Sequence, residues 1–545
     1  MGSFGDFIIA RTGMMSSQMA LNITGQNISN INTPGYTRRA LDQQTFVVNG
    51  SGLYRSSSTV YAGAGVMMNG VSQLRDPYLD IRFRNEMSGV GSADSLLAGM
   101  EQINSVINDV GIKGITKQFQ DLLDKFGKLN ANKVGTAEFD NLIKNSAQSL
   151  CQIFNLAASK LQDVKDNYET KYKEEVGNVD TLIQNIRDIN EQIRKADING
   201  DSALELRDKR NTLLDELSQY MKVDITYDKE DLGAGVEIEK LTIKMVDKST
   251  GKPSYTLVDG INSANIEMND DYSINVSALK DRNGNVIQTP KLGADGKPET
   301  DPVTGAVIMV DAVPNGDITE GMGYGALESM RQILTGQGEY SVNGENANKG
   351  IPYYQASLDA LAKTFADAMN RLNTQDANGT ALDPNKIPGA GNLFETSDKT
   401  ADITAANISI SDEWRNGTVS IVASTQENAP SDANDNILRF QALFSQNISY
   451  EGGQAGSVIY NGTFEGFYAN MQGVLGLDIQ ATSSMYDTYA TAADDLNNSR
   501  DGVSGVDLNE EGVNMMQYQK AFAASCRMVT ALDELMDQVI NRMGV

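Results

Sequence analysis

Heptad repeats of apolar residues at the two ends of the chain constrain its fold more than any other feature of the 545-residue sequence. In such a repeat every seventh residue is apolar, which is typical of helices that pair as coiled coils. The N-terminal repeat consists of Phe7, Met14, Leu21 and Ile28. The C-terminal repeat fills two heptad positions, with Met515, Phe522, Val529 and Met536 on one and Tyr518, Ser525, Leu532 and Val539 on the other. We expect helices over 3–32 and 512–543 that pair with each other and with further subunits, although a helix buried inside one large domain would carry a similar pattern.

The N-terminal helix carries almost no charge beside its apolar stripe. Between Ser3 and Asn32 only Asp6 and Arg11 are charged, and amides, hydroxyls and small residues fill the remaining faces. A charge that loses its water without gaining a partner is strongly destabilising, so uncharged polar faces suit a helix with neighbours on several sides. Residues 1–60 hold four Arg and two Asp (net +2), whereas 501–545 hold seven acidic and three basic residues (net −4), which makes the two ends electrostatically compatible.

A tight turn should follow the first helix. Thr33 precedes a proline and is therefore disfavoured in helical geometry, which ends the helix near Asn32. Pro34 and Gly35 fit the central positions of a type II turn that Tyr36 completes. Arg38 and Arg39 then lead into a strand-like segment at 41–50. Within the helix we expect polar contacts from the amide side chains of Asn22, Asn27 and Asn30.

Composition excludes several classes of function. The net charge of −27 argues against nucleic-acid and anionic-membrane partners, which need a concentrated cationic surface. The chain has no histidine, which removes Ser-His-Asp and Cys-His nucleophiles, the HExxH motif and nearly every zinc site that two cysteines could build. Cys151 and Cys526 cannot form a disulfide framework, although one bridge stays possible. We expect no catalytic, cofactor or metal site, while a carboxylate pair of the glycosidase kind stays open, because spatial separation cannot be read from sequence.

Two further patterns are weak evidence, one for a signal peptide and one for a calcium site. The run FIIA at 7–10 has no basic residue before it and is too short for a cleavable signal peptide, so we expect export by another route. The segments DANG at 376–379 and DANDN at 432–436 space oxygen ligands two residues apart, but both lack the Gly and Glu of an EF-hand loop. We interpret them as turns or helix caps.

The middle of the chain changes pattern twice. Helical spacing runs from about 85 to 220, as in Leu96, Met100, Ile103 and Ile107 and again in Leu182, Ile186, Ile189 and Ile193. Short β-prone runs such as VDITYD and KLTIKMVD follow, separated by Asp, Asn, Gly and Pro. Helical spacing returns at 327–372 and 464–498, around a mixed, loop-rich segment.

We therefore predict a multidomain α+β protein with paired terminal coiled-coil helices, a long helical bundle and inserted β-rich outer domains. Its four parts are a terminal helical domain of 1–84 with 500–545, a helical middle domain of 85–221 with 322–375 and 456–499, a β-rich outer domain of 222–321, and a mixed α/β insertion of 376–455. The terminal helices should form one end of an elongated molecule, with the β-rich insertions projecting from the other.

Segments at both ends of the sequence also resemble those of known proteins. LNITGQNISNINTPGYTRR at 21–39 and the segment 504–541 resemble the terminal signatures of bacterial flagellar rod, hook and first hook-associated proteins. Four internal blocks, at 74–86, 204–218, 351–373 and 403–414, are similar to segments of the first hook-associated family, and rod and hook proteins lack this long helical middle. Nothing comparable is found for 222–320.

The resemblance implies a structural function. Such subunits form a short helical tubular layer that connects hook to filament, with terminal helices around the channel, hook protein on one side and the next hook-associated protein on the other. It also implies extracellular location in the flagellum, export through the flagellar type III apparatus, and an export chaperone at the C-terminal segment. A sibling rod or hook protein and a surface carbohydrate-active enzyme are the alternatives.

Overall fold

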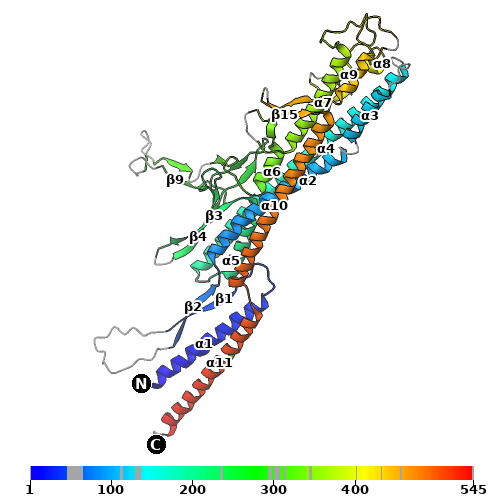
Figure 1. Ribbon diagram of the computed structural model, residues 1–545. Helices are drawn as coiled ribbons and strands as arrows, with labels where there is room; N and C mark the ends of the chain where they lie inside the picture. Colours follow the sequence, from blue (N-terminus) through cyan, green and yellow to red (C-terminus); the bar gives the residue numbers. More distant parts are fainter. Residues whose placement is uncertain are drawn as a thin grey trace.

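A computed structural model describes residues 2–45, 65–110, 114–128, 137–233, 237–291, 298–299, 307–311, 315–342, 347–399, 402–430, 433–454 and 457–542. The chain runs up one side of a long rod and returns down it, so that both termini lie at the same end (Figure 1). The predicted multidomain α+β class is confirmed. No helix in the described ranges has the length and apolarity needed to cross a membrane.

Long helices build the rod because their apolar residues recur at helical spacing along one face. Ile103, Ile107, Ile186 and Ile193 are all buried, as the spacing predicts. The helix with the most residues, α4, pairs with its neighbours over much of its length, and α2 lies along α10. The rod helices are α2 (Pro77–Val110), α3 (Thr116–Gly127), α4 (Ala137–Ile198), α5 (Leu204–Tyr220), α6 (Ala326–Thr335), α7 (Ile351–Thr374) and α10 (Phe464–Ser504).

Aromatic rings fill the core at the upper end of the rod. Phe365 is fully buried, and its ring centroid lies 5.3 Å from that of Phe119 and 5.5 Å from that of Phe464. Phe394 and Trp414 extend the cluster into the mixed segment, which caps this end. The capping elements are β12 (Phe394–Thr396), β13 (Ile408–Ile410), α8 (Asp412–Asn416) and α9 (Asp435–Leu443). Three further elements pack lower down, beside the starts of α7 and α10, namely η3 (Gly338–Tyr340), β14 (Ile448–Glu451) and β15 (Val458–Gly462).

The β-rich unit leaves the flank of the rod (Figure 1). Its main sheet is antiparallel in the order β3-β4-β5-β6, and a second sheet has the order β11-β8-β7. The strands are β3 (Val223–Asp231), β4 (Glu237–Val246), β5 (Pro253–Asp259), β6 (Asn262–Ser263), β7 (Ile266–Met268), β8 (Ile274–Val276), β9 (Gln288–Pro290), β10 (Met309–Asp311) and β11 (Gly316–Asp317). The prediction that the β-rich insertions project from the far end is therefore wrong for 222–321, because this unit packs on α4 midway along the rod, and only the mixed segment reaches the far end.

The lower end consists of two helices and a ribbon. α1 (Gly2–Ser29) and α11 (Leu508–Asp537) lie antiparallel, and a short π-helical turn, η4 (Gln538–Arg542), extends α11. The antiparallel strands β1 (Arg39–Thr45) and β2 (Val66–Gln73) pack beside α1. The rest of the strand-like segment predicted for 41–50 lies outside the described residues. Helices α2 and α10 run unbroken past positions 84 and 499, where we placed domain boundaries.

The two cysteines are free thiols. Cys151 is buried in the rod core, and burial raises the pKa of its thiol to about 12. Cys526 lies half-buried on α11. Asp376 of the DANG segment accepts hydrogen bonds from the amide nitrogens of Asn378 and Thr380, both at 2.8 Å, so the turn interpretation is confirmed there.

Candidate assembly interface

The terminal segment, defined as α1 with α11, packs lengthwise through small side chains on α1. Ala10, Ala20 and Thr24 are buried there, and an added Cβ at Gly13 would lie 3.2 Å from the Ser525 hydroxyl oxygen. Small residues let two helix backbones approach closely, as at Gly13 and Ser525. The heptad pattern of large residues did not predict that Gly13 of α1 lies against α11. The small residues between the heptad positions were the available sequence signal for such a close approach.

The predicted apolar residues of the terminal segment are at most half-buried in the single chain. Phe7 keeps 43% of its surface exposed and Val539 keeps 57%. The half-buried ones are Met14, Leu21, Ile28, Met515, Phe522, Val529, Leu532 and Met536. Further large apolar side chains on the outer faces are exposed, namely Ile8, Met15, Met19, Met516, Met528, Leu535 and Ile540. Exposed apolar surface of this extent marks a surface for association.

The asparagines and the turn lie at the upper end of α1. The helix ends at Ser29, three residues earlier than predicted, and a further turn covers 30–32. The Tyr36 amide donates to the Thr33 carbonyl at 3.2 Å, and Gly35 has φ +75°, as a type II turn after Pro34 requires. A Cβ on Gly35 would lie 2.5 Å from Thr212 Oγ1 of α5, so this position has no room for a larger residue.

Two of the three predicted asparagines form side-chain hydrogen bonds around this turn. Asn27 is buried: its Nδ2 donates to the Arg39 carbonyl at 3.0 Å, and its Oδ1 accepts from the Arg39 amide and from the Tyr36 hydroxyl. Asn30 donates to the Gln26 carbonyl and accepts from Thr33 Oγ1. Asn22 is exposed. The described contacts of Asn27 and Asn30 therefore hold the chain's own turn in place.

Two consecutive arginines join the terminal segment to the rod. Arg38 binds the start of α11, with Nε 2.7 Å from Glu511 Oε1 and Nη2 3.0 Å from Glu510 Oε1. Its backbone amide also donates to the Ser504 carbonyl at 2.8 Å. The hydrogen bond with Glu510 has the largest effect on the Arg38 pKa, which is raised. This pair is the electrostatic contact between the chain ends, and it lies at the junction rather than along the helices.

Arg39 binds the rod instead. Its Nη1 lies 2.6 Å from Glu205 Oε1 and its Nη2 3.8 Å from Asp208 Oδ2, both at the start of α5. Burial raises the pKa of the Asp208 carboxyl. Because Arg38 and Arg39 are neighbours in sequence yet bind different helices, they fix the orientation of the terminal segment on the rod.

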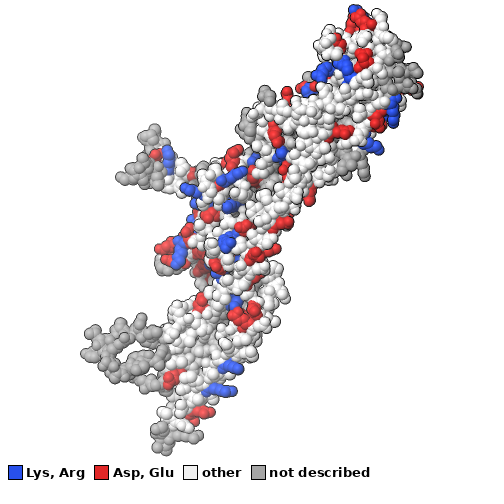
Figure 2. Space-filling view, viewed as in Figure 1, with Lys and Arg blue, Asp and Glu red and all other residues white. Residues whose placement is uncertain are grey.

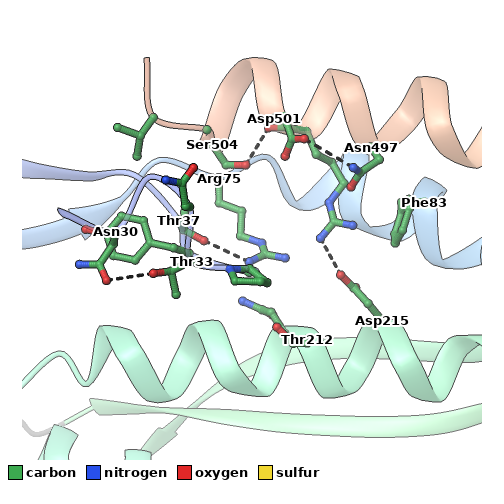
Figure 3. Close-up of a pocket in the computed structure, with 18 of the residues that line it drawn as sticks. Asn30, Thr33, Thr37, Arg75, Phe83, Thr212, Asp215, Asn497, Asp501 and Ser504 are labelled. Atoms are coloured by element: carbon green, nitrogen blue, oxygen red, sulfur yellow. Dashed lines mark hydrogen bonds and ion pairs between the residues drawn. The ribbon is translucent and has the colours of Figure 1, made fainter. Parts of the chain in front are cut away.

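A chain of alternating charges continues inside the rod. Arg500 of α10 lies between two carboxylates, with Nε 2.9 Å from Asp80 Oδ1 and Nη2 2.7 Å from Asp215 Oδ2. Arg84 also binds Asp215, at 2.7 Å, and the Arg500 guanidinium lies over the Phe83 ring at 4.3 Å. Phe83, Asp215 and Arg500 also line a pocket of about 680 Å³ beside the Thr33–Tyr36 turn, and Figure 3 shows Phe83 and Asp215 with other residues around it. We predicted neither this network nor the ion pairs of Arg38 and Arg39. Only for the two arginines was there a usable signal, since they are adjacent basic residues after a helix with almost no charge.

The described residues offer no metal site: they contain no group of three or more Cys, Asp and Glu side chains that could hold an ion. What the geometry provides is a pair of incompletely covered helices, held at a fixed angle on a well-packed rod.

Comparison with known families agrees with this division of the molecule. The family model described as flagellar hook-associated protein FlgK helical domain matches residues 100–389, more than half of the chain. The chain belongs to the FlgK family. Two shorter models match its ends: flagella basal body rod protein at 8–37, and flagellar basal body rod FlgEFG protein C-terminal at 502–543. The FlgK-specific match thus covers the end of α2, the helices α3 to α7 and the β-rich unit, whereas α10 lies outside it. The two models named for flagellar rod proteins cover α1 with its turn, and α11.

Relatives match along their whole length. Flagellar hook-associated protein 1 of Bacillus subtilis strain 168 is 25% identical, over 98% of this chain and 97% of the relative. The proteins of that name from Salmonella typhimurium strain LT2 and Escherichia coli strain K12 are 24% and 22% identical, with 98% of each chain covered. The fold resembles the flagellar hook junction protein FlgK from Burkholderia pseudomallei, with a TM-score of 0.52 and 12% identity over 78% of this chain and 100% of that one. This FlgK-family chain is a structural component of the bacterial flagellum.

Proposed function

We propose that many copies of this chain form the short tubular layer that connects hook to filament, with α1 and α11 around the central channel. In this arrangement hook protein lies on one side and the next hook-associated protein on the other. The observation that carries the proposal is the exposed apolar surface along both terminal helices, in a chain of the FlgK family. Neighbouring copies would cover that surface, which two lone helices leave in water.

The interface residues we propose are those of the heptad repeats. They include Phe7, Met14, Leu21 and Ile28 on α1, and Met515, Phe522, Val529, Leu532, Met536 and Val539 on or just beyond α11. Asn22 would add a polar contact to a neighbour, since its side chain is exposed, whereas Asn27, Asn30 and the turn act by setting the angle of α1. The protein acts by binding, without a catalytic step.

Replacing Val529 by Asp tests the interface. A carboxylate at this half-buried position would have to lose its water when a neighbour packs against it, so we expect incorporation into flagella to be abolished in cells that lack the native gene. The rod should keep its thermal unfolding transition. Val342→Asp is the matched control, since Val342 is 66% exposed outside the terminal segment, and it should assemble normally. Normal filaments from the Val529 variant would refute the interface.

We further propose that the protein reaches the flagellum through the type III export apparatus, with a chaperone holding the C-terminal segment before assembly. An amphipathic helix such as α11 can lie in a groove of such a partner. Deleting 504–545 should therefore remove chaperone binding measured by calorimetry. Unchanged affinity of the truncated chain would show that the chaperone binds elsewhere.

A further inference from the structure

The outward face of α10 lacks the charges of an ordinary exposed helix. Among the exposed side chains between 469 and 491, which we call the α10 face, Asp487 is the one charged residue. Leu477 and Met485 keep 67% and 51% of their surface exposed there, and Figure 2 shows this part of the rod largely white. A helix face that stays in water normally carries charged residues, so this face is typical of one that a partner covers.

A second uncharged face lies on the upper part of α4. The exposed side chains between 141 and 159, which we call the upper α4 face, are amides, Ser159 and the two leucines Leu142 and Leu156. These leucines keep 51% and 50% of their surface exposed. The next turns on the same side of α4 carry exposed charges, Asp163 and Glu174 among them. The uncharged stretch is therefore a local feature of α4 and not the general surface of the rod.

The two faces lie on different sides of the rod. Helices α2, α3 and α7 each pack against both α4 and α10 and separate the two. Because each face points away from these shared neighbours, one copy can bind a second copy through its α10 face and a third through its upper α4 face. Such a contact joins unlike surfaces, and its repetition builds a ring or a helix.

Large residues of one face can meet small residues of the other. Both α4 and α10 run from the upper end of the rod downward, so they are parallel between two copies that point the same way (Figure 1). A register that sets Leu477 beside Ser149 of the next copy also sets Leu156 beside Ser484, because both pairs are seven residues apart on each helix. At both levels a leucine therefore faces a serine, which leaves room for the two helices to approach.

The same register also brings opposite charges together. Neither Lys160, half-buried at the edge of the upper α4 face, nor Asp487 has an ion-pair partner among the described residues. In contrast, Lys144 of the same stretch of α4 binds Asp140 at 3.4 Å. With Leu477 beside Ser149, Lys160 lies within one helical position of Asp487. Each face thus carries a charge that the other face can pair.

We propose that the α10 face of one copy binds the upper α4 face of the next copy around the tubular layer, in this register. The inference rests on the proposed function and adds an interface on the rod to that of the terminal helices. Helix α10 leads directly into α11, with Val503 and Leu508 exposed at the join, so the α10 face continues toward the terminal interface. The apolar residues supply affinity, and the charge pair favours the correct register.

Cysteine cross-linking in isolated flagella tests the pairing. In a Cys526→Ser background that keeps the buried Cys151, Ser149→Cys with Leu477→Cys in one chain should give a disulfide-linked ladder of multimers, because each copy then joins two neighbours. Each single variant should stay monomeric, since the contact joins unlike faces. Thr181→Cys with Leu477→Cys is the matched control, because Thr181 is exposed on the same side of α4 but below the upper α4 face. Multimers from a single variant or from the control, or no ladder in normally assembled flagella, overturn the proposal.

A charge exchange covers the case in which the cysteine pair itself prevents assembly. Asp487→Lys should lower incorporation at least fivefold, because every contact between rods then holds two like charges. Asp487→Lys with Lys160→Asp should restore incorporation, since the pair is re-formed with opposite polarity. An unaffected single variant, or absence of rescue, refutes the contact.

The proposed function and this inference fail separately. Normal incorporation of the Val529→Asp variant refutes the terminal interface. A defective Val529 variant, together with no ladder and no rescue, refutes only the contact between rods.

Discussion

The rod and the terminal segment use the same element, a long helix with regularly spaced apolar residues, with opposite results. In the rod, α2, α4, α7 and α10 cover one another, and residues such as Ile103, Phe365 and Leu475 are fully buried. In the terminal segment, α1 is covered by α11 and the β1–β2 ribbon, while α11 has α1 as its main neighbour. The difference teaches that apolar periodicity specifies a helix face, whereas the number of neighbours decides whether that face is a core or an interface.

The largest expected effect of this difference is on backbone protection. Ordering each residue costs about 1–2 kcal/mol of backbone entropy, which a two-helix contact offsets poorly. In a dilute monomer we expect amides of α1 and α11 to exchange at least a thousandfold faster than those of α4 and α7, measured by hydrogen–deuterium exchange with mass spectrometry. Equal protection in both regions would mean that the terminal segment is stable by itself.

One substitution in both regions sharpens the comparison. Phe365→Ala removes a fully buried ring that contacts Phe119 and Phe464, and should lower the free energy of unfolding of the rod by about 3–5 kcal/mol. Phe522→Ala removes a half-buried ring of α11 and should lower it by less than about 1 kcal/mol, while reducing incorporation into flagella. Urea unfolding followed by circular dichroism measures the first effect and filament counts the second. A large loss of rod stability from the Phe522 variant would contradict the division.

The junction between the two regions should show a smaller, local effect. Glu511 keeps only 2% of its side chain exposed, so Arg38→Ala leaves a buried carboxylate without its cation. We expect local opening at 504–511 that is easier by about 2–3 kcal/mol, detected as faster amide exchange there with α4 unchanged. Adding Glu511→Gln to this variant removes the unpaired charge and should recover part of the loss. No recovery would assign the effect of Arg38 to packing.

Sequence periodicity predicted much of the fold because it reports local physics. The helical spacing through Ile103 and Ile186, the β-prone runs after Met221 and the turn at Pro34–Gly35 each depend on neighbouring residues, and each is found in the structure. The position of the β-rich unit along the rod could not be predicted from periodicity, because that position depends on the contacts of the unit with α4. The pairing of Arg500 with Asp80 and Asp215 likewise joins residues far apart in the chain.

By itself, the sequence determined that the ends are amphipathic helices with almost uncharged polar faces on α1, that a Pro-Gly turn follows α1, and that histidine chemistry is absent. Only the tertiary structure decided that Arg38 binds Glu510 and Glu511 while Arg39 binds Glu205. It also decided that Gly13 of α1 lies against Ser525 of α11, and which apolar side chains stay exposed. The physical reason is that periodicity is a property of consecutive residues, whereas burial and ion pairing depend on which distant segments share the same space.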